Sequence, residues 1–236
     1  MEEILPGTLY LVATPIGNLA DITYRAVHIL NNVDLIAAED TRQSRILLNH
    51  YLIKTPLVSY HSYNLMKQTP QLIRRLKAQQ SIALISDAGT PGISDPGYQL
   101  VQSAIEEHIR IVPIPGASAL LTALVASGLP TNRFVYEGFL PLKKGRKTRL
   151  QQLALEERTI VLYESPHRIQ KTIGDILDIF GDRPCVLARE LTKLYEELLR
   201  GTLSGFGELL KTKKLKGEIV LIIAGKGKKD KARENE

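Results

Sequence analysis

Residues 82–97 read IALISDAGTPGISDPG and join an apolar run to a loop of Gly, Pro and small polar residues. The run Ile82–Ser86 predicts a buried strand, because it is short, apolar and bounded by turn residues. In the loop Ser86–Gly97, glycines let the backbone approach a ligand closely and prolines stiffen the chain. A strand ending in such a loop is typical of an open α/β sheet, which binds ligands at the carboxyl ends of its strands.

The alternation of strands and helices continues on both sides of this stretch. Further strands are predicted at Thr8–Ala13, Leu35–Ala38, Leu57–Ser59 and Ile109–Ile114. Helical patterns lie between them, near Ile22–Leu30, Gln43–Tyr51, Gln68–Lys77 and Tyr98–Glu107. This order predicts a mostly parallel sheet covered by helices on both faces.

The second half of the chain has a different pattern. Strands are predicted at Phe134–Glu137, Ile160–Tyr163, Val186–Arg189, Glu196–Thr202 and Glu218–Ala224, with helices near Ser118–Ala126, Arg146–Glu156, Ile169–Phe180 and Phe206–Lys211. Two of these strands flank Leu194 with no helix between them, which indicates a mixed or antiparallel sheet. We therefore expect a parallel α/β domain over residues 1–116, a mixed-sheet α/β domain over 117–225 and a disordered basic tail over 226–236.

Composition narrows the class of protein. The chain is 44% hydrophobic and has no apolar run near the ~20 residues that span a bilayer. Its first residues resemble neither a secretory signal nor a transit peptide, so we expect a cytoplasmic protein. The single cysteine, Cys185, lies in an apolar run and is interpreted as a small buried hydrophobe rather than a catalytic thiol.

The net charge of +6 is unevenly distributed. Residues 1–117 carry 9 Lys and Arg against 10 Asp and Glu, whereas residues 118–236 carry 22 against 15. A basic second half suits a polyanionic partner, although a solubilising surface and a basic tail would give the same count.

Three loops in the first half share the composition of Ser86–Gly97. Ala13–Leu19 follows the first strand and Pro113–Ser118 follows the fifth, so all three are expected at one edge of the sheet. Their backbone groups suit a ligand that carries adenine, ribose, an amino-acid end and a sulfonium. The sequence lacks GxxxxGK[ST], lacks GxGxxG after the first strand, and shows no Cys/His spacing for zinc, so a P-loop, a dinucleotide site and a metal site are not expected.

Polar clusters follow four other strands. They are Glu39–Arg42, Tyr60–Ser62, Glu164–Arg168 and Arg189–Lys193. Each cluster has two interpretations: a part of a functional site, or a solvated helix cap, for which Asp40 and Ser165 have suitable side chains.

Taken together, these motifs resemble a known family. SDAGTPGISDPG, VATPIGNL, AEDTR, PGASA, GFLP (Gly138–Pro141), YESPHR and RELTKLYEE occur in the order of, and look like, the signatures of the ribosomal RNA small subunit methyltransferase I family, within the tetrapyrrole methylase superfamily. The resemblance covers about residues 8–225. Tetrapyrrole-modifying relatives usually carry GxGDP and Tyr-Met-Gly, where this chain has Ser86–Pro91 and Tyr163–Ser165, so the RNA branch fits better.

The resemblance implies two α/β domains with S-adenosylmethionine in the cleft between them, and a homodimer. It implies 2′-O-methylation of a cytidine in the decoding centre of 16S rRNA, with the small ribosomal subunit as partner and no membrane. Carried over by position, the cofactor contacts are Pro15, Gly17, Asp87, Ala88, Gly89, Thr90, Pro91, Pro115, Gly116, Ala117, Ser118, Ala119, Glu164 and Ala188.

The remaining candidates follow from what ribose methylation needs. A hydroxyl attacks only as its proton leaves, and candidate bases are Glu39, Asp40, Glu164 and Glu190. Arg42, Arg168 and Lys193 are candidates to steady an alkoxide or a phosphate. Phosphate contacts are expected from Lys143, Lys144, Arg146, Lys147 and Arg149, with a second cluster at Lys211, Lys213, Lys214 and Lys216, and stacking from Tyr60, Tyr63, Phe139 or Tyr163.

Two other functions stay open at this point. A tetrapyrrole methyltransferase would have a deep apolar pocket and would leave the basic half unexplained. A non-catalytic RNA-binding assembly factor would bind RNA without transferring a methyl group, but would have no need of three stiff, small-residue loops.

Overall fold

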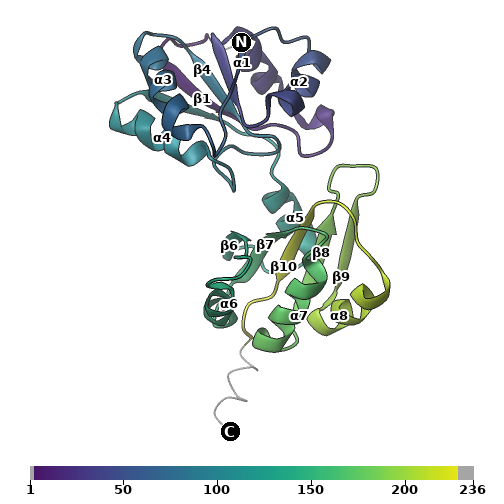
Figure 1. Cartoon of the computed structure of the whole chain (residues 1–236). Coiled ribbons are helices and arrows are strands. Elements are labelled where there is room, and N and C mark those ends of the chain that lie inside the picture. The colour runs from purple at the N-terminus through teal and green to yellow at the C-terminus, as the bar shows by residue number, and fades with distance from the viewer. Residues whose placement is uncertain (1–2, 228–236) are drawn as a thin grey trace. The chain divides into compact units, whose positions relative to one another are not determined.

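The structure is a computed structural model in which residues 3–227 are described. The chain divides into two compact units, Met1–Ser118 and Ala119–Glu236 (Figure 1). Within residues 3–227 the strands form two five-stranded sheets, one in each unit. Most of the expected tail, from residue 228 on, lies outside the described residues.

Unit 1 is an all-parallel α/β sheet. Its strands are β1 (Thr8–Val12), β2 (Leu35–Ala38), β3 (Leu57–Ser59), β4 (Ile82–Ile85) and β5 (Arg110–Ile114), in the order β3-β2-β4-β1-β5. Its helices are the short 3-10 helix η1 (Leu19–Asp21), α1 (Tyr24–Asn32), α2 (Thr41–His50), α3 (Leu65–Lys77) and α4 (Gly97–Glu106). Every pairing in this sheet is parallel, so all five strands end at one edge.

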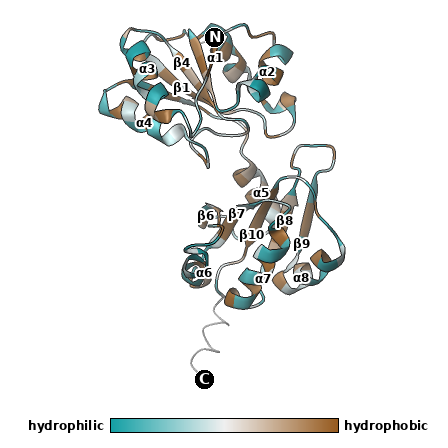
Figure 2. Ribbon diagram, viewed as in Figure 1, coloured by the Kyte–Doolittle hydropathy of each residue, from teal (hydrophilic) through white to brown (hydrophobic). Residues whose placement is uncertain are grey.

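The two faces of this sheet are covered by different helices. One core cluster joins Ile29 and Leu48, from α1 and α2, to the strands, and a second joins Leu72 and Leu100, from α3 and α4, to the opposite face. Figure 1 shows these two helix pairs on opposite sides of the strands. The central strands β1, β2 and β4 are therefore almost fully buried, and Figure 2 shows strand ribbons in the brown of hydrophobic residues.

Unit 2 contains a mixed sheet with helices mainly on one face. Its strands are β6 (Phe134–Phe139), β7 (Thr159–Glu164), β8 (Pro184–Arg189), β9 (Glu197–Thr202) and β10 (Ile219–Ile223), in the order β6-β7-β10-β8-β9. Its helices are α5 (Ala119–Ser127), α6 (Arg146–Ala154), α7 (Ile169–Phe180) and α8 (Leu203–Thr212). β6 and β7 are parallel, whereas β10 runs antiparallel to both β7 and β8.

Helix α7 shows how the sequence selects this packing. Its apolar residues Ile169, Ile173, Ile176 and Phe180 recur at three- and four-residue spacing and are buried in the core with residues of α6 and α8. Cys185 is in the same core, as expected, and burial raises the pKa of its thiol to about 12. The expected fold class, two α/β units, is confirmed. Among residues 3–227, no helix combines the length and apolar character of a membrane span.

Candidate functional site

The carboxyl edge of the unit 1 sheet brings the predicted loops together. Because the order β2-β4-β1-β5 is parallel throughout, the loops that begin at Glu39, Ser86, Ala13 and Pro115 follow neighbouring strands. The three glycine- and proline-rich loops therefore lie at one edge of the sheet, as expected.

The loops after β1 and β4 are joined by paired backbone hydrogen bonds. The Thr14 N–H donates to the Gly89 carbonyl over 2.9 Å, and the Gly89 N–H donates to the Thr14 carbonyl over 3.0 Å. The buried hydroxyls of Thr14 and Ser86 donate to the carbonyls of Ser86 (3.1 Å) and Gly89 (3.2 Å). Gly89 has a φ of +82°, a left-handed conformation that favours glycine. These hydrogen bonds hold the two loops to each other.

The loop after β5 is held against the other two. The Thr90 hydroxyl donates to the Ala117 carbonyl over 3.3 Å. At Gly116, a Cβ would lie 2.9 Å from the Cβ of Ala13, so any side chain there would force β1 and this loop apart. Asp87, Ala88, Pro115 and Gly116 remain exposed, which leaves small residues and backbone at the surface of the edge.

Carboxylates of the loops after β2 and β4 approach one another at this edge. Asp87 accepts a hydrogen bond from the Asp40 N–H over 2.8 Å, which ties the β2 loop to the β4 loop. Asp95 accepts from the N–H groups of Gly92 (2.7 Å) and Gly97 (2.8 Å) and so closes the glycine-rich loop. No group of side chains suited to a metal ion occurs within residues 3–227.

Glu39 differs from the other candidate bases. Burial raises the pKa of its carboxyl, and the charges of Asp87 and Asp95 raise it further, against the opposing effects of the Asp87 N–H and His61. Asp40, by contrast, is the N-cap of α2 and forms a two-point contact with Arg42, from Nε over 3.1 Å and from Nη2 over 2.7 Å. Hydrogen bonds from Arg42 lower the pKa of Asp40 to about 2. The cap interpretation of Asp40 is thus confirmed.

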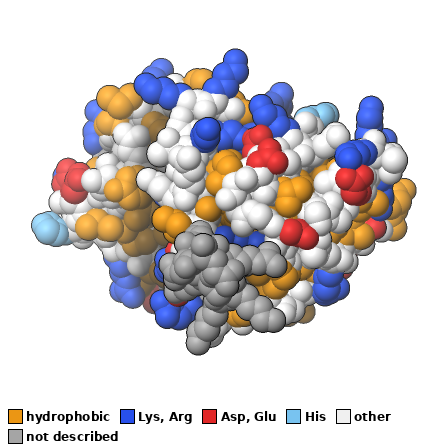
Figure 3. Space-filling view, turned by 90° about the horizontal axis from the view of Figure 1, so that it is seen from below, with side chains coloured by type: hydrophobic (Ala, Val, Ile, Leu, Met, Phe, Trp, Pro, Cys, Tyr) orange, Lys and Arg blue, Asp and Glu red, His pale blue; other side chains and the backbone are white. Residues whose placement is uncertain are grey.

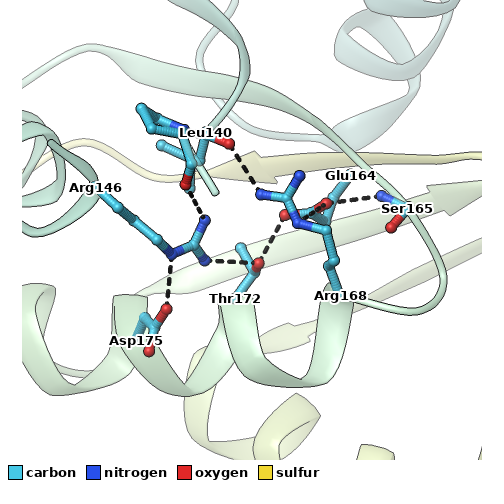
Figure 4. Close-up of polar contacts among 8 residues, drawn as sticks. Leu140, Arg146, Glu164, Ser165, Arg168, Thr172 and Asp175 are labelled. Carbon is cyan, nitrogen blue, oxygen red and sulfur yellow. Dashed lines mark hydrogen bonds and ion pairs between the residues drawn. The ribbon is translucent and has the colours of Figure 1, made fainter. Parts of the chain in front are cut away.

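Glu164 and its neighbours form a buried polar network in unit 2 (Figure 4). One carboxylate oxygen accepts from the Thr172 hydroxyl over 2.6 Å, and the other accepts from the Ser165 N–H over 2.8 Å and lies 3.3 Å from Arg168 Nε. Arg168 also donates to the Leu140 carbonyl over 2.9 Å. Because donors occupy both oxygens of Glu164, this carboxylate holds the end of β7 to α7 and to the loop after β6.

The network places Arg146 inside the unit, away from the lysines beside it in sequence. Its guanidinium donates to Asp175 (2.8 Å), to the Thr172 hydroxyl (2.8 Å) and to the Pro141 carbonyl (3.2 Å), and the residue is 7% exposed. Arg146 therefore anchors the basic loop and does not offer its charge to a ligand. Arg149 is similarly engaged, since it donates to both carboxylate oxygens of Glu137.

Glu190 and Lys193 lie in the turn between β8 and β9, as part of a second ionic network. The Lys193 ammonium donates to Glu190 over 3.1 Å and to Glu218 over 2.8 Å. Burial acts to raise the pKa of Glu190, but the Glu218 N–H and Lys193 outweigh it and the pKa is lowered. Glu190, like Asp40, is a weak base in this setting.

The remaining candidates are distributed as follows. Lys143, Lys144 and Lys147 are exposed. Tyr60 is buried, with its hydroxyl 3.0 Å from that of Thr69, so it cannot stack on a base, whereas Tyr63 is 98% exposed.

The α7 N-cap is Arg168 rather than Ser165. Ala188 is fully buried in the middle of the unit 2 sheet, opposite Val220. Pro15, Gly17 and Pro91 lie in the unit 1 loops, and Pro15 and Pro91 are buried.

Sequence reasoning missed several of these partners. Thr172, Asp175 and Asp95 complete the networks, yet each is a single polar residue in an unremarkable context. The signal that was available is the spacing of Glu164, Arg168 and Thr172, which recur every four residues across the start of α7.

Comparison with known proteins identifies the family. The profile of the family described as Tetrapyrrole (Corrin/Porphyrin) Methylases matches residues 8–206. Ribosomal RNA small subunit methyltransferase I of Halalkalibacterium halodurans is 54% identical over 94% of this chain and 78% of the relative. The protein of the same name from Thermotoga maritima is 48% identical over 93% of this chain and 99% of the relative. This chain belongs to the ribosomal RNA small subunit methyltransferase I family, a branch of the tetrapyrrole methylases.

Solved structures share the fold at low sequence identity. Cobalt precorrin-4 methyltransferase superposes with a TM-score of 0.69 at 17% identity, over 92% of this chain and 95% of that one. Uroporphyrin-III C-methyltransferase of Thermus thermophilus, in complex with S-adenosyl homocysteine, gives 0.66 at 19% identity, over 92% and 97%. This chain thus shares the fold of these methyltransferases.

Proposed function

We propose that this protein is an S-adenosylmethionine-dependent methyltransferase that methylates the ribose 2′-hydroxyl of a cytidine in the decoding centre of 16S rRNA. The observation that carries the proposal is the three-loop edge of unit 1 in a chain 54% identical to a protein named for methylating small-subunit rRNA. The cytoplasm and the small ribosomal subunit, as place and partner, belong to the same proposal, as does a homodimer.

The residues of the edge fit the cofactor. A ligand with a flat base, a ribose and an amino-acid end needs close backbone approach and fixed carbonyl and N–H groups, and the loops at Gly89 and Gly116 provide small residues on a braced backbone. We assign binding to Gly17, Asp87–Pro91 and Pro115–Ser118. When bound, S-adenosylmethionine supplies a methyl group on a sulfonium, which is already a good leaving group.

The chain's own work is then to position the ribose and to remove its proton. Holding the reacting atoms in a fixed geometry can lower the barrier to methyl transfer by up to ~7–11 kcal/mol, and loops braced by hydrogen bonds are suited to hold them. We assign the general base to Glu39, whose carboxylate accepts the 2′-hydroxyl proton. Asp40 and Glu190 are occupied by donors that favour the ionised carboxylate and lower its pKa, and both oxygens of Glu164 already accept hydrogen bonds.

Phosphate binding falls to exposed lysines of unit 2. Lys143, Lys144 and Lys147 follow β6 and carry no acidic partner among the described residues. Figure 3 shows Lys and Arg side chains interspersed with acidic and hydrophobic ones on the face seen from below. Because charges of both signs are mixed on that face, the proposed RNA contact rests on the exposed lysines of the loop after β6.

The experiment is methyl transfer from labelled cofactor to small subunits and to naked 16S rRNA, followed by mapping of the labelled nucleotide. Label on the base instead of the ribose, or none on RNA while a tetrapyrrole precursor is methylated, would refute the proposal.

The base assignment is tested by Glu39→Gln, with Asp40→Asn as the matched control. Glu39→Gln should lower turnover by roughly 10²–10⁴-fold with cofactor affinity retained, whereas Asp40→Asn should not. Because the folded pKa of Glu39 lies above the ordinary 4.5, the wild-type rate should rise with pH through that raised value, with unit slope. The assignment fails if Glu39→Gln keeps the same acidic limb.

A further inference from the structure

The turn between β8 and β9 lies at the same end of the unit 2 sheet as the basic loop after β6. Ile219, the first residue of β10, pairs with both Glu164 at the end of β7 and Arg189 at the end of β8. Phe139, at the end of β6, pairs with Tyr163. Strand register therefore brings residues 190–196 and 140–147 to one end of the sheet.

The backbone of this turn is held in an uncommon conformation. Glu190 and Thr192 have φ values of +49° and +67°, which place two non-glycine residues in the left-handed region. Hydrogen bonds fix it: the Glu190 N–H donates to the Glu218 carbonyl (3.0 Å), the Lys193 N–H to the Glu190 carbonyl (3.0 Å), and the Thr192 N–H to the Glu196 carboxylate (2.6 Å).

Side-chain ion pairs and hydrogen bonds also hold the turn between β8 and β9. Lys193 bridges Glu190 and Glu218, and Arg189 donates to Glu197 over 2.6 Å. A Cβ at Gly217 would overlap the Glu190 carboxyl group, so the two segments are in direct contact. Lys193, a candidate catalytic residue from its sequence, is thus a positioning residue of this turn.

The braced turn exposes two large apolar side chains. Leu194 is 88% exposed and Tyr195 is 69% exposed. Among the residues that the structure describes, Tyr195 has no hydrogen-bond or ring partner. Single exposed hydrophobics are ordinary, but these two are adjacent, and the turn that carries them is held by five hydrogen bonds to carboxylates.

The charges around the tip indicate the kind of partner. Each carboxylate here, of Glu190, Glu196, Glu197 and Glu218, accepts a hydrogen bond from a cation or a backbone N–H. Lys214 and Lys216, in the segment leading to β10, are exposed and have no acidic partner among residues 3–227. An exposed aromatic ring flanked by free cations is the combination that binds unpaired nucleotides.

We propose that Tyr195 stacks on an unpaired base of the substrate RNA, with Leu194 packing beside it. Lys214 and Lys216 contact the flanking phosphates. The inference rests on the proposed RNA substrate and adds the element that binds it. That element is the turn with Leu194 and Tyr195, at the end of the unit 2 sheet where Lys143 and Lys144 also lie.

The test uses the absence of tryptophan from this chain. Tyr195→Trp places a single fluorophore at the tip, and Leu155→Trp places one at an exposed site beyond α6, near the start of β7 and so at the other end of the sheet. Each full-length variant is titrated with single-stranded RNA of the decoding-centre sequence and with the same RNA annealed to its complement. Stacking should quench the tip fluorophore with the single strand, and neither the duplex nor the Leu155→Trp variant should show it.

Affinity is measured in parallel. Tyr195→Ala should weaken single-strand binding by about 5- to 150-fold, and Tyr195→Phe should bind as wild type. Leu194→Ala should also weaken binding, whereas its control, Leu155→Ala, should not. RNA binding and methyl transfer without quenching would overturn the tip assignment and leave the proposed function standing. If the wild-type protein neither binds RNA nor transfers a methyl group to it, both the tip assignment and the proposed function are overturned. A fluorescence change that follows protein concentration without RNA, with a doubled mass, would assign the tip to a contact between two copies and refute RNA stacking.

Discussion

Replacing Thr172 with Val tests whether the buried network of unit 2 is held together by one hydroxyl. The Thr172 hydroxyl donates to Glu164 over 2.6 Å and accepts from Arg146 over 2.8 Å, and the residue is 1% exposed. Thr172→Val keeps the shape of the side chain but leaves one carboxylate oxygen and one guanidinium nitrogen without this partner.

The size of the effect follows from those two bonds. A hydrogen bond to a charged group contributes about 1.5–3 kcal/mol, and the two bonds share one atom, so their losses are not additive. Glu164 retains Arg168 and the Ser165 N–H, and Arg146 retains Asp175. We therefore expect Thr172→Val to destabilise unit 2 by about 2–4 kcal/mol. Thr172→Ser, which keeps the hydroxyl and loses one methyl group, should cost about 1 kcal/mol.

Amide hydrogen exchange measures this in the full chain, because peptides from unit 1 provide an internal reference. Where exchange requires unfolding of unit 2, α7 peptides of Thr172→Val should exchange about 30- to 1,000-fold faster than wild type, with unit 1 peptides unchanged. If Thr172→Val accelerates α7 exchange no more than Thr172→Ser does, the hydroxyl does not hold the network and the reasoning from its two bonds is wrong.

Three further predictions follow from single contacts. Cys185, whose pKa burial raises to about 12, should resist iodoacetamide in the native protein and react only on unfolding; labelling without denaturant would contradict its burial. Gly116→Val should abolish cofactor binding measured by calorimetry, because its Cβ would lie 2.9 Å from that of Ala13, whereas Gly128→Ala, with open space around it but a left-handed backbone, should only reduce stability. Lys143→Gln and Lys144→Gln should each reduce the slope of log affinity for single-stranded RNA against log salt by about 0.7, and unchanged slopes would remove these lysines from the interface.

The elements of this protein were predictable because their signals are local. The β-branched runs that end at Val12, Ile85 and Ile114 form strands within one or two residues of the expected bounds, and their glycine- and proline-rich loops meet at one edge because parallel strands leave no other arrangement. The absence of a helix around Leu194 correctly indicated antiparallel strands.

The state of individual polar residues was not predictable in the same way. Arg146 lies in the run Lys143–Lys147 and has the local sequence of a solvated cation, but its partner Asp175 is 29 residues away and reaches it only through the packing of α6 on α7. Tyr60 follows a strand like the exposed loop residues, yet the helix α3 brings Thr69 to its hydroxyl and buries it. Burial of a polar group depends on which elements pack over it, and periodicity within one element carries no information about that.

These contacts also place four similar carboxylates in different environments. A carboxylate that accepts hydrogen bonds from a cation or from N–H groups is held ionised and in place, which suits it to fix a loop and reduces its affinity for a substrate proton. Asp40 and Glu190 are of this kind. Both oxygens of Glu164 accept hydrogen bonds that fix the end of β7. Glu39 is partly buried beside Asp87 and Asp95, so its environment disfavours the charge and increases its affinity for a proton. At the unit 1 edge, the paired Asp40 thus fixes a loop, whereas Glu39, crowded by like charges, is the carboxylate suited to accept a proton.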